Sequence, residues 1–310
     1  MQESNQSLGG VTGTAFAVAV VLGGANFIAV RFSNQELDPF FGAGLRFSIA
    51  AILFVLICVV MRVRWPRGRQ LALAVVAGVL SFAAFYALMY WALLQVTAGV
   101  ATVVLALVPL VTILLTAAQH LERLRASAFI GSLLAIAGIA WIMVSPSEVA
   151  LPWTALLAMI GAAVCAGQGV IVTKKVSGNH PAVINAIGML TGAGFLLVMS
   201  ALVGEKWALP TQPEVWVALL YLVTLGSVGL FLLVLLVIRR WTASATSYMF
   251  VLFPLVTMLL DAVITGVPIT VSGIIGAVLV MAGVWFGALA PSARAPIAPT
   301  PPDRVVLESG

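Results

Sequence analysis

The chain has 310 residues, of which 62% are hydrophobic and only 8% are charged, so it lacks the polar surface that a soluble domain of this length needs. The composition indicates an integral membrane protein. The net charge of +5 comes from basic residues scattered in pairs between apolar runs rather than gathered on one face, which argues against a nucleic-acid partner.

Ten apolar runs are long enough to cross a membrane, because about 20 helical residues span the roughly 30 Å of hydrocarbon. They do not alternate polar with apolar residues, which excludes a closed barrel. The connections are short and several are marked by proline, so no soluble catalytic domain fits between the runs. The runs cover residues 11–31, 40–61, 70–94, 98–117, 127–144, 153–173, 181–203, 215–238, 242–265 and 270–290.

The basic residues predict the orientation in the membrane. If the N-terminus is cytoplasmic, twelve Lys or Arg residues fall on the cytoplasmic side and only Arg31 and Lys206 fall outside. This asymmetry follows the positive-inside rule and predicts a multi-pass membrane protein with both termini in the cytoplasm. Residues 1–10 would be a cytoplasmic N-terminus, and residues 292–310, rich in Pro and Ala, a disordered cytoplasmic tail.

One stretch of the sequence occurs twice. Thr97–Thr116 recurs 145 residues later as Thr242–Asp261 with nine of twenty positions identical, including a Pro-Leu-Val-Thr run that begins at Pro109 and at Pro254. Such a repeat indicates that the chain is built from two related halves.

The two halves, residues 11–147 and 148–291, hold five predicted spans each. Since five is odd, the second half enters the membrane from the opposite face, which predicts inverted repeats of the kind found in secondary transporters, with a substrate site at their junction. The fold expected is therefore all-α, with ten transmembrane helices in two inverted five-helix repeats. Glycines in the fifth and tenth runs repeat at the same offset and permit close helix contact; they are Gly131, Gly138, Gly276 and Gly283.

Several features together resemble the drug/metabolite transporter superfamily. They are the two five-span halves, the small-residue sequence Leu-Gly-Gly-Ala-Asn-Phe that begins at Leu22, the second span with Pro39, Arg46 and Phe47, and the repeated stretches. Within it the chain is similar to the EamA-type permeases, most closely the bacterial inner-membrane amino-acid exporters of the YddG kind, which implies the same membrane for this chain. The resemblance covers about residues 11–290. It implies a basket of ten helices around a central cavity, and we expect a monomer or a weak homodimer.

Two amides inside the spans are candidates for substrate binding. Asn26 in the first span matches Gln168 in the sixth if an offset of 142, which relates Pro39 to Pro181, holds there. Each amide offers a donor and an acceptor to a zwitterion. The alternative is a hydrogen bond that joins helices.

Aromatic side chains form a second candidate set. Tyr86 and Tyr90 lie four residues apart on one helical face, with Phe82 one turn earlier. Together with Tyr248 and Phe253 of the ninth span, they would line a pocket for apolar or aromatic substrate side chains. Ordinary helix packing is the alternative.

Two pairs of residues are candidates for a hinge or a gate. Pro109 and Pro254 each remove a backbone donor, so they provide either hinges or static kinks. Arg46 and Asp261 lie inside spans at similar depth from the outer face, which predicts a structural or outer-gate ion pair; snorkelling of each to the interface is the alternative. Because no unpaired mid-membrane carboxylate then remains to carry a proton, facilitated movement is favoured over proton antiport.

These patterns predict a carrier that exports amino acids, neutral and above all aromatic or apolar ones, by alternating access. A permease for drugs or for another metabolite such as a nucleoside is the alternative in the same class. We expect no enzyme, cofactor or metal. The enzyme alternatives, an intramembrane protease or a haem-dependent oxidoreductase, need a histidine within the membrane as base or ligand, whereas His120 and His180 fall in loops. A receptor or scaffold that binds ligand without moving it stays open.

Overall fold

The computed structural model describes residues 2–121, 126–144, 152–176, 178–241, 246–266 and 269–286. The predicted tail, residues 292–310, lies outside these ranges. Within them the structure is helical and contains no strand. The elements are α1 (Gln2–Ser33), α2 (Pro39–Val60), α3 (Arg69–Gly78), η1 (Val79–Ala84), α4 (Phe85–Ala92), α5 (Ala98–Leu105), α6 (Val108–Ala118), α7 (Ala126–Val144), α8 (Trp153–Val176), α9 (Pro181–Val203), α10 (Pro213–Val223), η2 (Thr224–Gly229), α11 (Leu230–Arg240), α13 (Met249–Ile264) and α14 (Val271–Val284).

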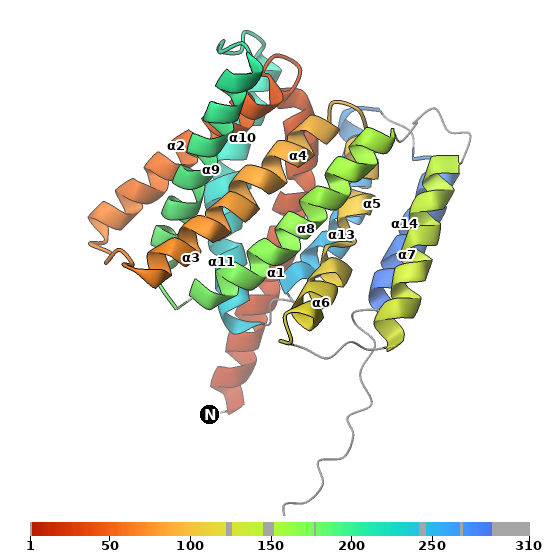
Figure 1. Ribbon diagram of the computed structural model, residues 1–310, viewed down its shortest axis with the longest axis horizontal. Helices are drawn as coiled ribbons and strands as arrows, with labels where there is room; N and C mark the ends of the chain where they lie inside the picture. Colours follow the sequence, from red (N-terminus) through yellow and green to blue (C-terminus); the bar gives the residue numbers. More distant parts are fainter. Residues whose placement is uncertain are drawn as a thin grey trace, which may run out of the picture.

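Each predicted apolar run falls on one helix or on a series of helices. By length and composition, seven helical stretches of the described residues can cross a membrane, while α13 and α14 are shorter apolar helices. The prediction of a multi-pass helical membrane protein is therefore confirmed. The first helix is longer than predicted, since it begins at Gln2, and its N-terminal end projects beyond the other helices (Figure 1).

Two of the long helical stretches contain a π-helical turn. In η1 (Val79–Ala84) and η2 (Thr224–Gly229) the backbone takes a wider turn, and the two segments lie 145 residues apart, the same offset as the repeated stretch. Glycine and serine lie in or beside both turns, and the Ser227 hydroxyl donates to the Leu222 carbonyl at 2.7 Å. Such turns are rare and are often found at functional sites.

The two repeated prolines have different local structures. Before Pro109 the helix is interrupted at Ala106 and Leu107, so that α5 and α6 are separate. This interruption follows from the missing proline amide, which cannot bond to the carbonyl four residues earlier. Pro254 instead lies within α13, in its second turn, without an interruption. The two prolines therefore do not produce matching bends.

The helices pack mainly across the two predicted halves. Helix α2 lies on α9, α1 lies on α13 and α11, and α8 lies on α4, α3 and α6. Helices α7 and α14 lie side by side at one edge of the molecule (Figure 1).

Glycines allow α7 and α14 to approach closely, as predicted. A methyl group on Gly138 would lie 2.9 Å from the Gly276 carbonyl oxygen, and one on Gly283 would lie 2.5 Å from the Gly131 carbonyl oxygen. A shift of 145 residues exchanges these two contacts, because it relates Gly131 to Gly276 and Gly138 to Gly283. The crossing is therefore self-complementary.

Candidate functional site

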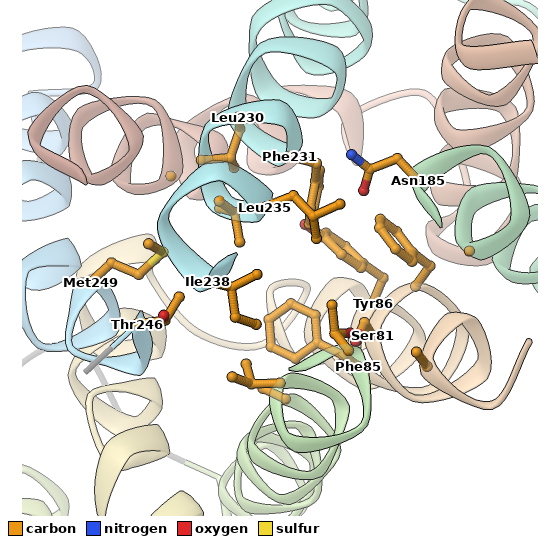
Figure 2. Close-up of a pocket in the computed structure, with 18 of the residues that line it drawn as sticks. Ser81, Phe85, Tyr86, Asn185, Leu230, Phe231, Leu235, Ile238, Thr246 and Met249 are labelled. Atoms are coloured by element: carbon orange, nitrogen blue, oxygen red, sulfur yellow. The ribbon is translucent and has the colours of Figure 1, made fainter. Parts of the chain in front are cut away.

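A cavity of about 120 Å³ lies between helices of both predicted halves. Because about 10–15 Å³ suffices for one water molecule, the space is large enough for a ligand. Figure 2 shows side chains from α4, α9 and α11 converging on it, together with Thr246 and Met249. Among the residues that the structure describes, none that lines the cavity carries a charge.

Aromatic rings form much of the cavity wall. Phe82 of η1 lies with its ring centroid 4.7 Å from that of Phe231 in α11, and Phe250 of α13 lies 5.0 Å from Phe253. Phe85 lies 6.2 Å from Phe250 and so connects α4 with α13. These contacts form an apolar wall contributed by both halves, suited to an apolar or aromatic group.

The structure brings some of the predicted site residues together and places others elsewhere. Asn26, Phe82, Tyr86 and Phe253 line the cavity, whereas Tyr90, Gln168 and Tyr248 do not. The polar, aromatic and methionine side chains of the lining that sequence reasoning missed include Ser81, Phe85, Met89, Asn185, Phe231, Thr246, Met249 and Phe250.

The expected symmetry between Asn26 and Gln168 is absent from the site. The Gln168 side-chain oxygen accepts a hydrogen bond from Gln119 at 2.8 Å, outside the cavity. The second amide of the cavity is Asn185, on α9. Its position as a lone amide in an apolar run was a signal that the sequence offered, since polar groups within a membrane are functional candidates.

Both amides of the cavity have one atom without a hydrogen-bond partner. Asn26 is 4% exposed and Asn185 is 2% exposed, yet Asn26 Oδ1 and Asn185 Nδ2 are unpaired. The Asn26 Nδ2 atom donates to the Gly226 carbonyl at 3.1 Å. A buried polar atom without a partner costs roughly 1–3 kcal/mol, so a ligand that reached either atom would gain a hydrogen bond that the protein does not supply.

Arg46 lies behind the cavity wall and is fully buried. Its Nε donates to the Ser227 hydroxyl at 2.8 Å, its Nη2 to the Gly226 carbonyl at 2.8 Å, and its Nη1 to the Tyr90 hydroxyl at 3.3 Å. The guanidinium carbon also lies 5.1 Å from the ring centroid of Tyr86, within cation–π range.

The predicted ion pair between Arg46 and Asp261 was wrong. Asp261 instead pairs with Arg31, with Nη1 and Oδ1 at 3.6 Å, and accepts a hydrogen bond from the Thr265 hydroxyl. Arg31 reaches Asp261 because it lies in the last turn of α1, which packs on α13. Arg46 and Asp261 lie at similar depth in the membrane, but on helix faces that do not meet.

Carboxylates join the α1–α2 connection to the α9–α10 connection. Glu36 accepts hydrogen bonds from the Thr211 and Gln212 amides at 2.8 and 2.9 Å, and Glu205 accepts from the Phe40 and Phe41 amides at 3.0 and 2.7 Å. Each carboxylate thus binds amides at the start of a helix of the other half, a favourable place for negative charge.

We call Glu36, Asp38 and Glu205 the carboxylate latch, since Asp38 also accepts from the Lys206 amide at 2.7 Å. The Gln212 amide and the Thr211 hydroxyl lower the pKa of Glu36 below its ordinary value. The cavity extends away from the latch, toward Thr173 and Ile238 near the ends of α8 and α11 that carry basic residues.

A cavity enclosed by helices that can cross a membrane is typical of polytopic membrane carriers. The model of the EamA-like transporter family matches residues 12–144 and, a second time, residues 153–288. The chain therefore belongs to the EamA-like transporter family.

Relatives are named as transporters. The chain is 28% identical over 256 residues to the uncharacterized inner membrane transporter YedA of Escherichia coli K12, covering 82% of each chain. It is 23% identical to an uncharacterized transporter of Archaeoglobus fulgidus, covering 87% of this chain and 96% of that one. It is 29% identical to the probable terminal-alkyne amino-acid exporter of Streptantibioticus cattleyicolor over 59% of this chain and 62% of the other.

The fold also matches a solved crystal structure with a TM-score of 0.67. That match covers 90% of this chain and 97% of the other at 20% identity, so it supports the fold alone.

Proposed function

We propose that this protein exports amino acids or similar small zwitterions across the inner membrane, by alternating access between two inverted five-helix halves with ten crossings in all. It would resemble the YddG-type exporters. Support for the two halves comes from the double family match, the π-helical turns at an offset of 145 and the self-complementary α7–α14 crossing. Inverted repeats of this kind place the substrate at their junction.

The observation that carries the substrate class is the lining of the cavity. It combines an aromatic wall with two unpartnered amide atoms, those of Asn26 and Asn185, and no charged residue. Phosphorylated substrates need Arg or Lys side chains in contact with the phosphate, so the lining favours neutral or zwitterionic molecules. One relative named as an amino-acid exporter supports the same class.

The latch and the position of the cavity suggest which face is open. Carboxylates tie the halves together at one end, whereas the cavity extends toward the other end, which carries Arg69, Lys174 and Arg239. If that basic end is cytoplasmic, as the positive-inside rule requires, this conformation is closed to the outside and receives substrate from the cytoplasm.

Transport in liposomes tests the proposal. Purified protein is reconstituted and the release of labelled amino acids from loaded vesicles is measured with and without a pH gradient. We expect release of neutral amino acids with apolar side chains, and release without the gradient would favour facilitated movement. If no amino acid moves in folded protein, the exporter proposal fails; movement of nucleosides or drugs instead would favour the alternative permease.

A matched pair of variants checks that the cavity is the path. Val234→Trp fills the cavity, and Leu202→Trp adds the same ring to an exposed position on α9. We expect Val234→Trp to lower the rate by about tenfold or more, since overpacking a site removes the bound state, and Leu202→Trp to change it less than about twofold. Equal rates in both variants would mean that substrate does not pass through this cavity.

A further inference from the structure

The part of the cavity nearest the carboxylate latch lies beside a buried cation. Arg46 is fully buried, and its hydrogen-bond acceptors, in Ser227, Gly226 and Tyr90, are all neutral. In the part of the chain that the structure describes, no carboxylate lies within ion-pair distance of it. A charged group inside a membrane without a counter-ion is costly and marks a functional site.

An aromatic ring of the cavity wall contacts this cation. The guanidinium carbon lies 5.1 Å from the centroid of the Tyr86 ring, and Tyr86 lines the cavity. Because the lining itself is uncharged and the surroundings have a low dielectric constant, the charge of Arg46 is felt across this short distance. The latch end of the cavity is therefore electropositive.

Asn26 supplies an acceptor at the same place. Its Nδ2 donates to the Gly226 carbonyl, and turning the amide over would bring two acceptor oxygens together, so the unpaired atom is the oxygen Oδ1. The same carbonyl accepts from Arg46 Nη2, which places Asn26 and Arg46 beside each other. In an α-amino acid a single carbon separates the carboxylate from the ammonium group, so one molecule can address both residues.

Resting on the proposed function, we infer that the substrate binds with its carboxylate toward Arg46 and the Tyr86 hydroxyl and with its ammonium group on Asn26 Oδ1. Arg46 then determines specificity by selecting molecules with a free carboxylate. The substrate side chain lies along the aromatic wall that contains Phe82 and Phe231. Amines and cationic drugs of the same shape are rejected, since nothing in the lining offsets their repulsion from Arg46.

Ligand-induced thermal stabilisation of the purified protein tests this inference separately from transport. Four probes share one ring: phenylalanine, phenethylamine without the carboxylate, N-acetylphenylalanine without the ammonium group, and 3-phenylpropionate with the carboxylate alone. We expect phenethylamine to need at least about tenfold higher concentration than phenylalanine, and 3-phenylpropionate to bind better than phenethylamine. Equal binding of phenethylamine and phenylalanine by the wild-type protein would overturn the inference.

Variants separate the two ends of the substrate. Arg46→Met should abolish the preference for phenylalanine over phenethylamine, while Arg46→Lys, which keeps the charge, should retain most of it. Asn26→Leu should make N-acetylphenylalanine bind as well as phenylalanine and leave the carboxylate preference in place. If Arg46→Met does not fold, Tyr86→Phe tests the contact with the substrate carboxylate instead. We expect the preference of this variant for phenylalanine over phenethylamine to fall by about threefold or more, and an unchanged preference would contradict the inference.

The two failures are distinguishable. Carboxylate-dependent binding through Arg46 in a protein that moves no amino acid would leave the inference standing and remove the proposed function. Amino-acid transport by a protein that binds phenethylamine as well as phenylalanine would leave the function and remove the inference. Leu202→Ala, at an exposed position on α9, is the control for both measurements.

Discussion

One backbone carbonyl organises the latch end of the cavity. The oxygen of Gly226 accepts from both Arg46 and Asn26, and the Ser227 hydroxyl beside it accepts from Arg46 as well. Both acceptors belong to η2, and their donors lie on α1 and α2. Two consecutive small residues thus hold side chains of two other helices.

A methyl group at Gly226 tests this arrangement. It would lie 2.1 Å from Asn26 Oδ1, so Gly226→Ala must displace the Asn26 side chain. We expect the transport rate to fall by about tenfold while the yield of folded protein changes much less, because the contact is with a side chain rather than with backbone. The control is Gly194→Ala on α9, where nothing lies within 4 Å of the added methyl group. Equal rates in the two variants would contradict a positioning role for Gly226.

At the scale of single residues, the sequence predicted several of the side chains that line the cavity, but not the hydrogen bonds and ion pairs that those side chains form. Asn26, Phe82 and Tyr86 were recognised as polar or aromatic groups at suitable depth and do line the cavity. Depth along a helix, however, leaves its rotation undetermined. This is why the predicted pairing of Arg46 with Asp261 is wrong, although the two residues lie at similar depth.

At the scale of elements, the helical face that lines the cavity is broader than the predicted aromatic stripe. A regular helix carries Phe82, Tyr86 and Tyr90 on one face, and that spacing underlay the predicted stripe. Phe85 and Met89, three and seven residues after Phe82, share this face and line the cavity, whereas the Tyr90 hydroxyl accepts a hydrogen bond from Arg46. The π-helical turns themselves arise from tertiary packing and side-chain bonds, so hydropathy cannot reveal them.

The interruption between α5 and α6 makes Pro109 the better hinge candidate of the two prolines. Pro109→Ala restores the backbone donor and allows α5 and α6 to join, which would stiffen this element. We expect its transport rate to fall by about fivefold or more with little change in folded yield, and Pro254→Ala to have the smaller effect. Initial rates in liposomes and size-exclusion yields measure both. Unchanged transport in Pro109→Ala would rule out a hinge there.

The glycine crossing of α7 and α14 should tolerate no side chain. A methyl group on Gly283 would lie 2.5 and 2.6 Å from backbone atoms of Gly131 and Ala135. Because backbone cannot move aside as a side chain can, we expect Gly283→Ala to lower the melting temperature by several degrees, equivalent to about 1–3 kcal/mol. Gly194→Ala serves again as the helical control. A melting temperature equal to the wild-type value would show that the two helices separate at no cost.

At the scale of the whole molecule, hydropathy predicted the membrane class, and the resemblance of several motifs to a known superfamily predicted the family. Which face of the carrier is open could be inferred only from the structure. No sequence pattern marked Glu36 and Glu205 as groups that bind across the two halves. Their partners, apart from the Thr211 hydroxyl, are backbone amides, which every residue except proline possesses. A hydrogen bond to a backbone amide therefore cannot be predicted from the type of residue that carries the amide.

The hydrogen bonds of the carboxylate latch predict that closure of the outer face depends on pH. The pKa of Glu36 is lowered from its ordinary value of 4.5, so its bonds stabilise this conformation above that pH and are lost as the pH falls through the lower value. We expect acid on the outer side, or Glu36→Gln at neutral pH, to increase the labelling of a Met89→Cys variant by an impermeant maleimide added outside. Glu214→Gln, at an exposed carboxylate in the first turn of α10, should leave labelling unchanged. Equal labelling in both glutamine variants would show that Glu36 does not hold this face closed.

The buried charge of Arg46 has a consequence for the membrane itself. A carrier that opens to each side in turn exposes a wet path, and any moment of incomplete closure would let protons or sodium ions run down their gradients. A fixed guanidinium beside that path raises the free energy of a small cation there, as arginine does in channels that exclude protons. Arg46 would therefore also reduce the leak of protons and sodium ions through the carrier. Liposomes containing Arg46→Met should lose an imposed pH gradient faster than those containing Arg46→Lys.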